Sequence, residues 1–380
     1  MDLQELRQKM DGIDNELIEL FKRRMAVSGE IAENKRTSGK AILDVARERA
    51  KLADVAEKAG ADMQEYATVL YSLIFEMSRG YQGKILNPTS PLKQKIDAAL
   101  DKTEKLFPQQ AMVACQGVEG AYSQLACDKL FRMPNIMYFS NFESVFSAIE
   151  NGMCRYGVLP LENSTAGSVN KIYDLMMQHK FSIVRSVRLK VDHNLLAKRG
   201  TKLSDITEIF SHEQAINQCG TFLKSLSNVK VTVCENTAMA AQMVSQSDRT
   251  DVAALSSRSC AELYELECLA GSVQDMGNNY TRFICISKDL EIYPGADKTS
   301  LMMVLPHRPG ALYKVLARFY ALGINLIKLE SRPIPDRDFE FMFYFDIETS
   351  VYSPQFSELI AQLENLCDEF SYLGSYLEIV

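Results

Sequence analysis

Two basic residues stand in a helical pattern at positions where apolar residues should continue. Apolar side chains recur at steps of three and four and predict one helix of about 33 residues: Leu3, Leu6, Met10, Ile13, Leu17, Leu20, Val27 and Ile31. The step after Leu20 falls on Arg24. Lys35 lies about 20° around this helix and about 16 Å along it from Arg24, so both side chains can reach one ligand. Because an unpaired buried guanidinium is very unfavourable, the spacing predicts a bound anion.

Polar side chains also interrupt two further predicted helices. Glu48, beside Arg47, takes an apolar step in the predicted helix of residues 43–59, and Ser78 and Gln82 share a face of the predicted helix of residues 63–84. Several cations around one carboxylate in an all-helical segment predict a pocket for a dianion. The alternative interpretation is that the cations extend to water while Glu48 pairs with a neighbouring arginine.

The first predicted helix is too long for a compact monomer. Its apolar seam needs partner helices, both from residues 43–84 and from a second copy of the chain. Arg7 lies about 25 Å from Arg24 and about 100° away around the helix, so it can reach such a pocket only in a partner chain.

A second group of polar residues follows an apolar run that Pro160 is expected to end. Glu162, Asn163, Ser164 and Thr165 come directly after YGVLPL. Burying four hydrogen-bonding side chains is costly unless a polar ligand lies against them. Other polar clusters, SHEQAINQC at 211–219 and NYTRFICI at 279–286, also lie at the ends of predicted strands, where open α/β sheets place ligands.

The pair Gly117 and Gly120 is interpreted as a tight turn because it lacks the lysine of a phosphate loop. No Gly-x-Ser-x-Gly elbow is present, which disfavours a serine hydrolase.

The periodicity of the chain divides it into segments. Residues 1–86 are predicted as a helical domain, and residues 87–108, with three prolines and many charges, as a linker. Residues 109–288 alternate short strands with helices and predict an α/β domain with a largely parallel sheet. Residues 296–380 predict a ferredoxin-like α+β module of order βαββαβ.

Composition restricts the class of partner. The chain has 380 residues, 47% of them apolar, a net charge of -7 and a pI near 5.4, so a nucleic-acid or membrane partner is disfavoured and a small-molecule role is favoured. The nine cysteines are scattered singly and the four histidines have no ligand spacing, so neither a disulfide framework nor a metal or other cofactor is expected. The amino terminus lacks an apolar signal region, and a cytoplasmic protein is expected.

The first segment resembles the helical chorismate mutases through LRQKMDGIDNELIELFKRR, Lys35, DVARER and SRGYQ. The resemblance implies a dimeric helical bundle whose substrate is chorismate. It implies that Arg24 and Arg47, with the partner's Arg7, bind the substrate carboxylates. Lys35 and Gln82 would lie at the ether oxygen, Glu48 and the region of Asp44 at the hydroxyl, and Ser78 nearby. A Claisen rearrangement needs no nucleophile, only a compact substrate and stabilised negative charge on the breaking ether oxygen.

The middle segment resembles prephenate dehydratase through LPLENSTAGSV, GVEGAYS, SHEQA and TRF. The resemblance implies a two-lobed, periplasmic-binding-protein-like domain with its cleft between the lobes, and VDHNLLAKRG is expected at the crossing into the second lobe. Thr281 is the residue most closely tied to catalysis, with Arg282 and Phe283 shaping the pocket. The remaining expected contacts are Ser123, Glu162, Asn163, Ser164 and Gln214. Glu162 could supply a proton if desolvation raised its pKa. Many relatives carry a glutamate where this chain has Ala166.

The last segment resembles a phenylalanine-binding ACT domain. Two motifs carry the resemblance: Gly310, Ala311 and Leu312, and Glu330, Ser331, Arg332 and Pro333. As turn and cap residues, Pro309 and Gly310 also have a purely structural explanation. The resemblance implies phenylalanine bound between two such modules of a homodimer or higher homo-oligomer, with feedback inhibition. The alternatives are a non-catalytic amino-acid sensor and a two-lobed transcription regulator, and the long acidic first helix disfavours the regulator.

Overall fold

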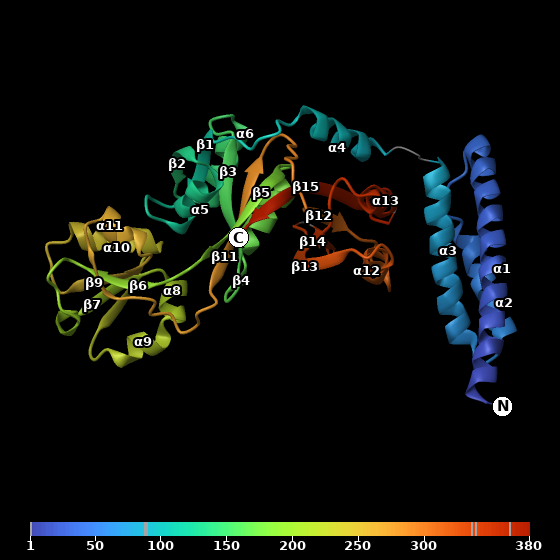
Figure 1. The fold of residues 1–380 in the computed structure, drawn as a ribbon, viewed down its shortest axis with the longest axis horizontal. Helices are drawn as coiled ribbons and strands as arrows, with labels where there is room; N and C mark the ends of the chain where they lie inside the picture. The colour runs from blue at the N-terminus through green and yellow to red at the C-terminus, as the bar shows by residue number, and fades with distance from the viewer. Residues whose placement is uncertain (1, 87–89, 336, 339, 365) are drawn as a thin grey trace. The chain divides into compact units, whose positions relative to one another are not determined.

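The computed structural model describes residues 2–86, 90–335, 337–338, 340–364 and 366–380 (Figure 1). The chain forms two compact units. One comprises Met1–Lys95, Pro309–Leu322 and Pro354–Cys367, and the other comprises Ile96–Arg308, Gly323–Ser353 and Asp368–Val380. No helix in the described part of the chain is both long and apolar enough to cross a membrane.

Three helices at the amino terminus confirm the predicted helical segment. They are α1 (Leu3–Ser38), α2 (Val45–Ala59) and α3 (Gln64–Leu86), and α3 lies alongside both α1 and α2. Gly39, with φ of 66°, ends α1 in the left-handed conformation that glycine adopts without strain. Asp44 caps α2, because its carboxylate accepts the backbone N–H of Arg47 at 3.0 Å.

The apolar residues of the predicted α1 seam, from Leu3 to Ile31, are all exposed in the single chain. The buried residues of α1, Ser28 and Ala32, lie beside that seam rather than on it, so α2 and α3 do not cover it as predicted. Toward the amino terminus, the side chains of Met10 and Leu17 remain 58% and 54% exposed, and the other seam residues from Leu3 to Leu20 are exposed as well. So much apolar surface on one helix marks an interaction site rather than a solvated face.

The predicted linker contains a helix and a packed segment. Residues 87–89 lie outside the described residues, whereas α4 (Pro91–Lys102) follows them. The hydroxyl of Thr103 accepts the backbone N–H of Ile292 at 3.1 Å. The ring of Phe107 packs 5.0 Å from that of Phe131, and the guanidinium of Arg185 lies 4.0 Å from the Phe107 ring centroid. The segment therefore ends as part of the second unit.

The first lobe of the second unit is a mixed sheet rather than the largely parallel one that was predicted. Its strands are β1 (Gln110–Gln116), β2 (Met133–Phe139), β3 (Tyr156–Asn163), β4 (Gly167–Ser168), β5 (Ser182–Lys190) and β11 (Tyr280–Ser287). Strands β2, β1 and β3 are parallel, but β11 returns from the second lobe and pairs antiparallel with both β3 and β5. The accompanying helices are α5 (Tyr122–Leu130), α6 (Phe142–Glu150) and α7 (Asn170–Gln178).

The second lobe contains a separate five-stranded sheet in the order β10-β6-β9-β7-β8. The strands are β6 (Asn194–Ala197), β7 (Glu208–Ser211), β8 (Lys230–Val233), β9 (Val252–Ser256) and β10 (Glu267–Ala270). The helices are α8 (Glu213–Gln218), α9 (Gly220–Ser225), α10 (Thr237–Gln246) and α11 (Ser259–Leu263), with a 3-10 turn at Leu203–Asp205. Residues 191–193 and 271–279 are the two connections between the lobes, which confirms the crossing expected at VDHNLLAKRG.

The last segment has the predicted element order. It comprises β12 (Lys298–Val304), α12 (Ala311–Ala321), β13 (Asn325–Pro333), β14 (Phe341–Glu348), α13 (Pro354–Leu363) and β15 (Glu369–Ile379). The four strands are antiparallel, in the order β13-β14-β12-β15. At its carboxyl end β15 also pairs parallel with β5, through Leu377–Ile379 and Arg185–Val187. One continuous sheet therefore joins these strands to the first lobe.

Candidate functional sites

A cavity of about 420 Å³ lies among the three amino-terminal helices. Its lining comprises Arg24, Val27, Ser28, Ile31, Lys35, Ile42, Asp44, Arg47, Glu48, Lys51, Tyr71, Phe75, Ser78, Arg79 and Gln82. Seven of the predicted mutase residues are brought together here: Arg24, Lys35, Asp44, Arg47, Glu48, Ser78 and Gln82. The eighth, Arg7, is exposed and does not line this cavity. Five lining side chains are cationic and two are carboxylates, so the cavity has a positive excess suited to a dianion.

Arg24 is half-buried and is turned toward α3 rather than fully extended into water. Its guanidinium donates to the hydroxyl of Ser78 and lies 5.6 Å from the centroid of the Phe75 ring. Burial lowers the pKa of Arg24, as expected for a cation that has lost hydration without gaining a carboxylate partner. The cation is therefore available to a negatively charged ligand.

Gln82 and Lys35 present further polar groups to the same cavity. The amide Nε2 of Gln82 donates to the hydroxyl of Ser28 at 3.0 Å, while its buried Oε1 has no hydrogen-bond partner among the described residues. Lys35 donates through Nζ to the backbone carbonyl of Ile42. Leaving the Gln82 Oε1 buried without a hydrogen bond is unfavourable in free energy. This indicates either that a ligand group donates to it or that the oxygen and nitrogen of the amide are exchanged by a 180° rotation.

Glu48 pairs with an arginine, as the alternative interpretation of the helical segment predicted. Its carboxylate accepts a hydrogen bond from Arg79 of α3, an arginine that the sequence reasoning missed. The signal for Arg79 was available, because it follows Ser78 directly and precedes Gln82 by three residues on the same helix.

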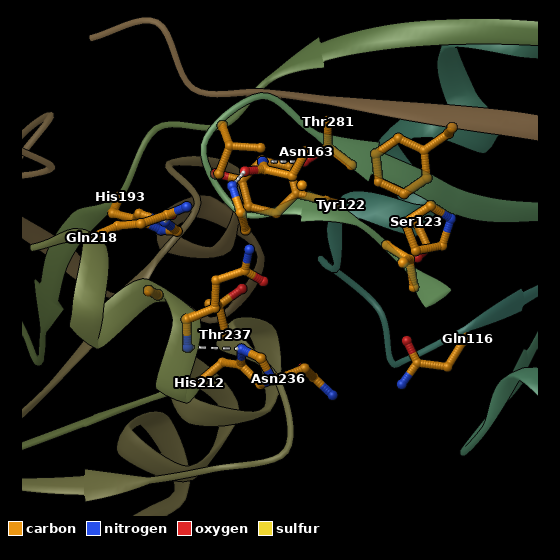
Figure 2. Close-up of a pocket in the computed structure, with 18 of the residues that line it drawn as sticks. Gln116, Tyr122, Ser123, Asn163, His193, His212, Gln218, Asn236, Thr237 and Thr281 are labelled. Atoms are coloured by element: carbon orange, nitrogen blue, oxygen red, sulfur yellow. Dashed lines mark hydrogen bonds between the residues drawn. The ribbon is translucent and has the colours of Figure 1, made fainter. Parts of the chain in front are cut away.

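A larger cavity, of about 630 Å³, lies in the second unit and is lined from both lobes. The predicted residues that line it are Ser123, Asn163, Gln214, Thr281 and Phe283. The first lobe also contributes Gln116 and Tyr122, and the second lobe contributes His212, Gln218, Asn236 and Thr237. Figure 2 shows Thr281 and Asn163 close together, with Asn236, Thr237 and His212 on another side of the cavity.

No lysine or arginine is among the described lining residues of this cavity, which include the carboxylate of Glu235, so anion binding there must rely on the histidines, on neutral side chains and on backbone N–H groups. Helix α5 begins at Tyr122 and helix α10 begins at Thr237, and both of these residues line the cavity. The free backbone N–H groups and the positive dipole end of a helix start favour carboxylates. Asn236 fixes the start of α10, because its side chain accepts the backbone N–H of Met239 at 2.7 Å.

The alternation of side chains along β11 separates the Thr-Arg-Phe residues. Thr281 and Phe283 face the cavity, whereas Arg282 faces the opposite side of the sheet. There Arg282 is 4% exposed, donates to Asp346 of β14, and has its Nε 3.1 Å from a carboxylate oxygen of Glu378 in β15. This placement corrects the expectation that Arg282 shapes the pocket.

Glu162 also lies outside this cavity and is not suited to donate a proton. Burial raises the pKa of Glu162, but a hydrogen bond from Lys328 and the charge of Arg282 outweigh burial, so that the pKa is lowered. The contact from Lys328 Nζ to the Glu162 carboxylate is 2.6 Å. The condition set for Glu162 as a proton donor, a raised pKa, is therefore not met.

Pro160 does not end the strand as predicted. Strand β3 continues to Asn163 with a bulge opposite Arg282 and Phe283, since the register shifts between the pairs Phe283–Pro160 and Arg282–Glu162. Proline has no N–H to donate to the ladder, and strands accommodate it at such irregularities. Ser164, expected to contact substrate, instead donates to the backbone carbonyl of Asn278 at 2.7 Å and does not line the cavity.

The residues expected to bind phenylalanine fall in two groups. Gly310, Ala311 and Leu312 lie at the start of α12 in the first unit, and Glu330, Ser331, Arg332 and Pro333 lie on β13 in the second unit. On β13, Glu330 accepts a hydrogen bond from Ser168, and Arg332 makes two contacts of 3.0 Å with Asp174 of α7. These side chains thus contact the first lobe directly.

Several cavity residues were not predicted as site residues, although some of them lie in sequence segments that were singled out. Asn236 and Thr237 could have been found, since a capping residue two positions after the predicted strand VKVTVC announces a helix start at a sheet edge. Gln218 lies in the cluster SHEQAINQC and His193 in the expected crossing VDHNLLAKRG, but nothing in the sequence distinguished either as a site residue, because only folding brings them together.

Comparison with known proteins agrees with this division of sites. The family model "Chorismate mutase type II" matches residues 6–83, and "Prephenate dehydratase" matches residues 113–291. A bifunctional chorismate mutase/prephenate dehydratase of Enterobacter agglomerans is 31% identical over 98% of this chain and 95% of its own length. Arogenate dehydratase/prephenate dehydratase 1 of Arabidopsis thaliana is 37% identical over 70% of this chain and 71% of its own length.

Solved structures resemble the dehydratase part. Prephenate dehydratase from Arthrobacter aurescens, in complex with L-Phe, matches with a TM-score of 0.64 and 27% identity over 70% of this chain and 89% of that one. The quorum-quenching acylase GqqA matches with a TM-score of 0.63 and 31% identity over 70% of this chain and 96% of that one. The near full-length match to a bifunctional relative, together with matches to both family models, decides the assignment: this chain belongs to the bifunctional chorismate mutase/prephenate dehydratase family.

Proposed function

We propose that the chain converts chorismate to prephenate in the helical cavity and prephenate to phenylpyruvate in the cavity between the two lobes. The observation that carries this proposal is the contrast between the two linings. The helical cavity has a cationic excess without an evident nucleophile-base pair, and the larger cavity has neutral donors and two helix starts around Thr281.

The helical cavity suits a rearrangement that needs no covalent catalysis. Arg24 and Arg47 bind the substrate carboxylates and favour the compact conformer in which the new bond can form. Lys35 stabilises the negative charge that grows on the ether oxygen. A 180° turn of the Gln82 amide would let its Oε1 accept a hydrogen bond from the Ser28 hydroxyl. The amide Nε2 would then point to the ether oxygen of the substrate and could donate to it.

The larger cavity suits loss of carbon dioxide together with the ring hydroxyl. Breaking the ring–carboxylate bond releases carbon dioxide, and its electron pair forms the aromatic ring as hydroxide leaves. The hydroxide takes up one proton and departs as water. The hydroxyl of Thr281 polarises the leaving group by hydrogen bonding, while the starts of α5 and α10 hold the carboxylates.

A second copy of the chain completes the mutase site in this proposal. The exposed seam of α1 is the surface available to that copy, and Arg7 lies on the same helix. Two inactive variants, Arg7→Ala and Arg24→Ala, test it. When they are mixed and allowed to exchange subunits, one site of each mixed dimer regains both arginines, so mutase turnover should reappear. Mixing that restores no turnover would refute a shared site.

Phenylalanine regulates the dehydratase through the carboxy-terminal segment in this proposal. The segment has the ACT order of elements and resembles that family in its two motifs. Contacts that can transmit binding run from β13, where Lys328 and Glu330 hydrogen-bond Ser168, a residue that lines the dehydratase cavity. A coupling free energy of about 1 to 3 kcal/mol between the two sites is typical of such inhibition.

One assay separates this proposal from a non-catalytic sensor. Purified full-length protein is incubated with chorismate, and prephenate and phenylpyruvate are followed with and without phenylalanine. Sequential appearance of both products, slowed by phenylalanine, is the expected result. Binding of phenylalanine without either product would support the sensor instead. Arogenate is supplied in a parallel assay because the Arabidopsis relative is named for it. Faster turnover of arogenate than of prephenate would refute prephenate as the dehydratase substrate.

A further inference from the structure

Two buried polar side chains lie in the connections between the lobes. His193, in the first connection, is 3% exposed, and Asn279, in the second, is 2% exposed. The connections are also joined through their backbones, since Val191 donates its N–H to the carbonyl of Asn279 at 2.8 Å. Buried polar groups at such a hinge must be satisfied by specific partners.

A continuous series of hydrogen bonds joins these two residues to Thr281. Asn163 Nδ2 donates to Thr281 Oγ1 at 2.9 Å and to Asn279 Oδ1 at 2.7 Å. Asn279 Nδ2 donates to Gln218 Oε1 at 2.9 Å, and His193 Nε2 lies 2.9 Å from the same oxygen. Gln218 belongs to α8 of the second lobe and Asn163 to β3 of the first, so the series crosses between the lobes.

Backbone N–H groups fix the direction of the whole series. The backbone N–H groups of Thr165 and Ala166 both donate to one side-chain atom of Asn163, at 3.0 and 2.9 Å, so that atom must be its oxygen. The other atom, Nδ2, is then a donor, and the atom of Asn279 that it contacts must be an oxygen. The remaining side-chain atom of Asn279 is then Nδ2, which donates a hydrogen bond to Gln218. The atom of Gln218 that accepts this bond must therefore be its oxygen, Oε1.

The series has a definite consequence at each end. At one end His193 must carry its proton on Nε2 to donate to the Gln218 oxygen, and the buried Nδ1 has no partner among the described residues. At the other end Thr281 Oγ1 is occupied as an acceptor by Asn163, and no described residue accepts the Thr281 hydroxyl proton. That proton is therefore left for a ligand in the cavity.

We propose that His193 and Asn279 are positioning residues of the dehydratase, which act through Gln218 and Asn163 to present the Thr281 hydroxyl as a hydrogen-bond donor to the leaving group. The inference rests on the proposed dehydratase function. Because Asn163 belongs to the first lobe and Gln218 to the second, the series also ties the orientation of Thr281 to the relative placement of the two lobes.

The surroundings of His193 keep the ring in its neutral form. Burial lowers the pKa of His193, with a smaller lowering from His212, whereas the hydrogen bond to Gln218 and the charge of Asp192 raise it. The net pKa is lowered, which agrees with a neutral ring that has one bare nitrogen.

Kinetics of full-length variants test the proposal. His193→Leu and Asn279→Leu should lower the dehydratase kcat roughly 10- to 100-fold with KM changed less than about threefold, because misorientation of a catalytic group affects the transition state more than binding. Asn279→Leu should be the more severe, since Asn163 then loses an acceptor as well. His193→Gln, which retains an Nε2 donor, should restore most of kcat. His179→Leu, a histidine outside the series, is the matched control and should not change kcat.

A spectroscopic measurement on the wild-type protein keeps the test independent of variant folding. Long-range 1H–15N spectra of histidine-labelled protein distinguish the two neutral tautomers, and His193 is expected as the Nε2–H form. An Nδ1–H form, or equal kcat for His193→Leu and wild type, would overturn the proposal. Wild-type protein that turns over chorismate but not prephenate would instead overturn the dehydratase function itself. Urea unfolding of each variant, followed by circular dichroism, reports whether the second unit has folded, because mutase turnover depends on the first unit alone.

Discussion

Replacing Asp346 by asparagine should destabilise the second unit although Asp346 lines no described cavity. Its carboxylate is fully buried and accepts hydrogen bonds from Arg282 and from the hydroxyl of Ser300. Two further carboxylates lie near Arg282, but each has another cation: Glu378 pairs with Arg188 and Glu162 with Lys328. Among the described residues, Asp346 is the carboxylate for which Arg282 alone supplies the opposite charge.

The expected loss in the free energy of unfolding for Asp346→Asn follows from this arrangement of charges. Removing one member of a buried ion pair typically costs 3 to 5 kcal/mol, because the remaining charge is left uncompensated. Asparagine retains an oxygen that can accept from Arg282, and two other carboxylates remain nearby, so the lower end applies, about 3 kcal/mol. Urea unfolding followed by circular dichroism measures the change in the transition that includes the second unit.

A matched control makes the same chemical change at the surface. Asp251 pairs with Arg249 at 2.9 Å, but its side chain is 38% exposed, so Asp251→Asn should change stability little. The double variant Arg282→Met, Asp346→Leu removes both charges and should be less destabilised than Asp346→Asn. A free energy of unfolding for Asp346→Asn that equals that of the surface control would refute the assignment of a buried, charge-dependent contact.

Three shorter predictions concern the two sites and pH. Thr281→Val should lower dehydratase turnover about 10²- to 10³-fold and leave the mutase unchanged, as loss of one transition-state donor does, and parallel loss of both activities would contradict separate sites. Lys35→Ala should lower mutase turnover by at least about 10²-fold in a chorismate assay while prephenate is still dehydrated. The lowered pKa of Glu162 means that its charge stabilises the fold above the ordinary carboxyl pKa and that this contribution is lost as pH falls through the lowered value. Lys328→Met removes a cause of the lowering, so acid unfolding should begin at a higher pH than in wild type, and an unchanged acid midpoint would contradict this account.

The sequence predicted most elements of the fold because their periodicities are strong. The three helices of the first segment, several strands of both lobes and the βαββαβ order were readable from apolar spacing and from the residues at turns, whereas β2, β6 and β10 were not predicted. It did not predict that the first-lobe sheet is mixed or that β15 continues into it beside β5, since strand pairing depends on contacts between segments far apart in the chain. Pro160 was misinterpreted because a bulge allows a strand to pass a residue that cannot donate.

The sequence by itself determined which residues could form the mutase cavity, because Arg24 and Lys35 share one helix and helical spacing fixes their separation. It also identified Thr281 and Asn163 at strand ends. Only the tertiary structure decided which neighbours of Thr281 face the cavity: Phe283 does, while Arg282 and Glu162 turn to the other side of the sheet. The same holds for the hydrogen-bond series to His193, since its members meet only when two lobes and two chain crossings are folded together. Spacing along one helix is a local property of the chain, whereas the direction of a side chain on a bulged strand and its partners across a hinge are set by packing between distant segments.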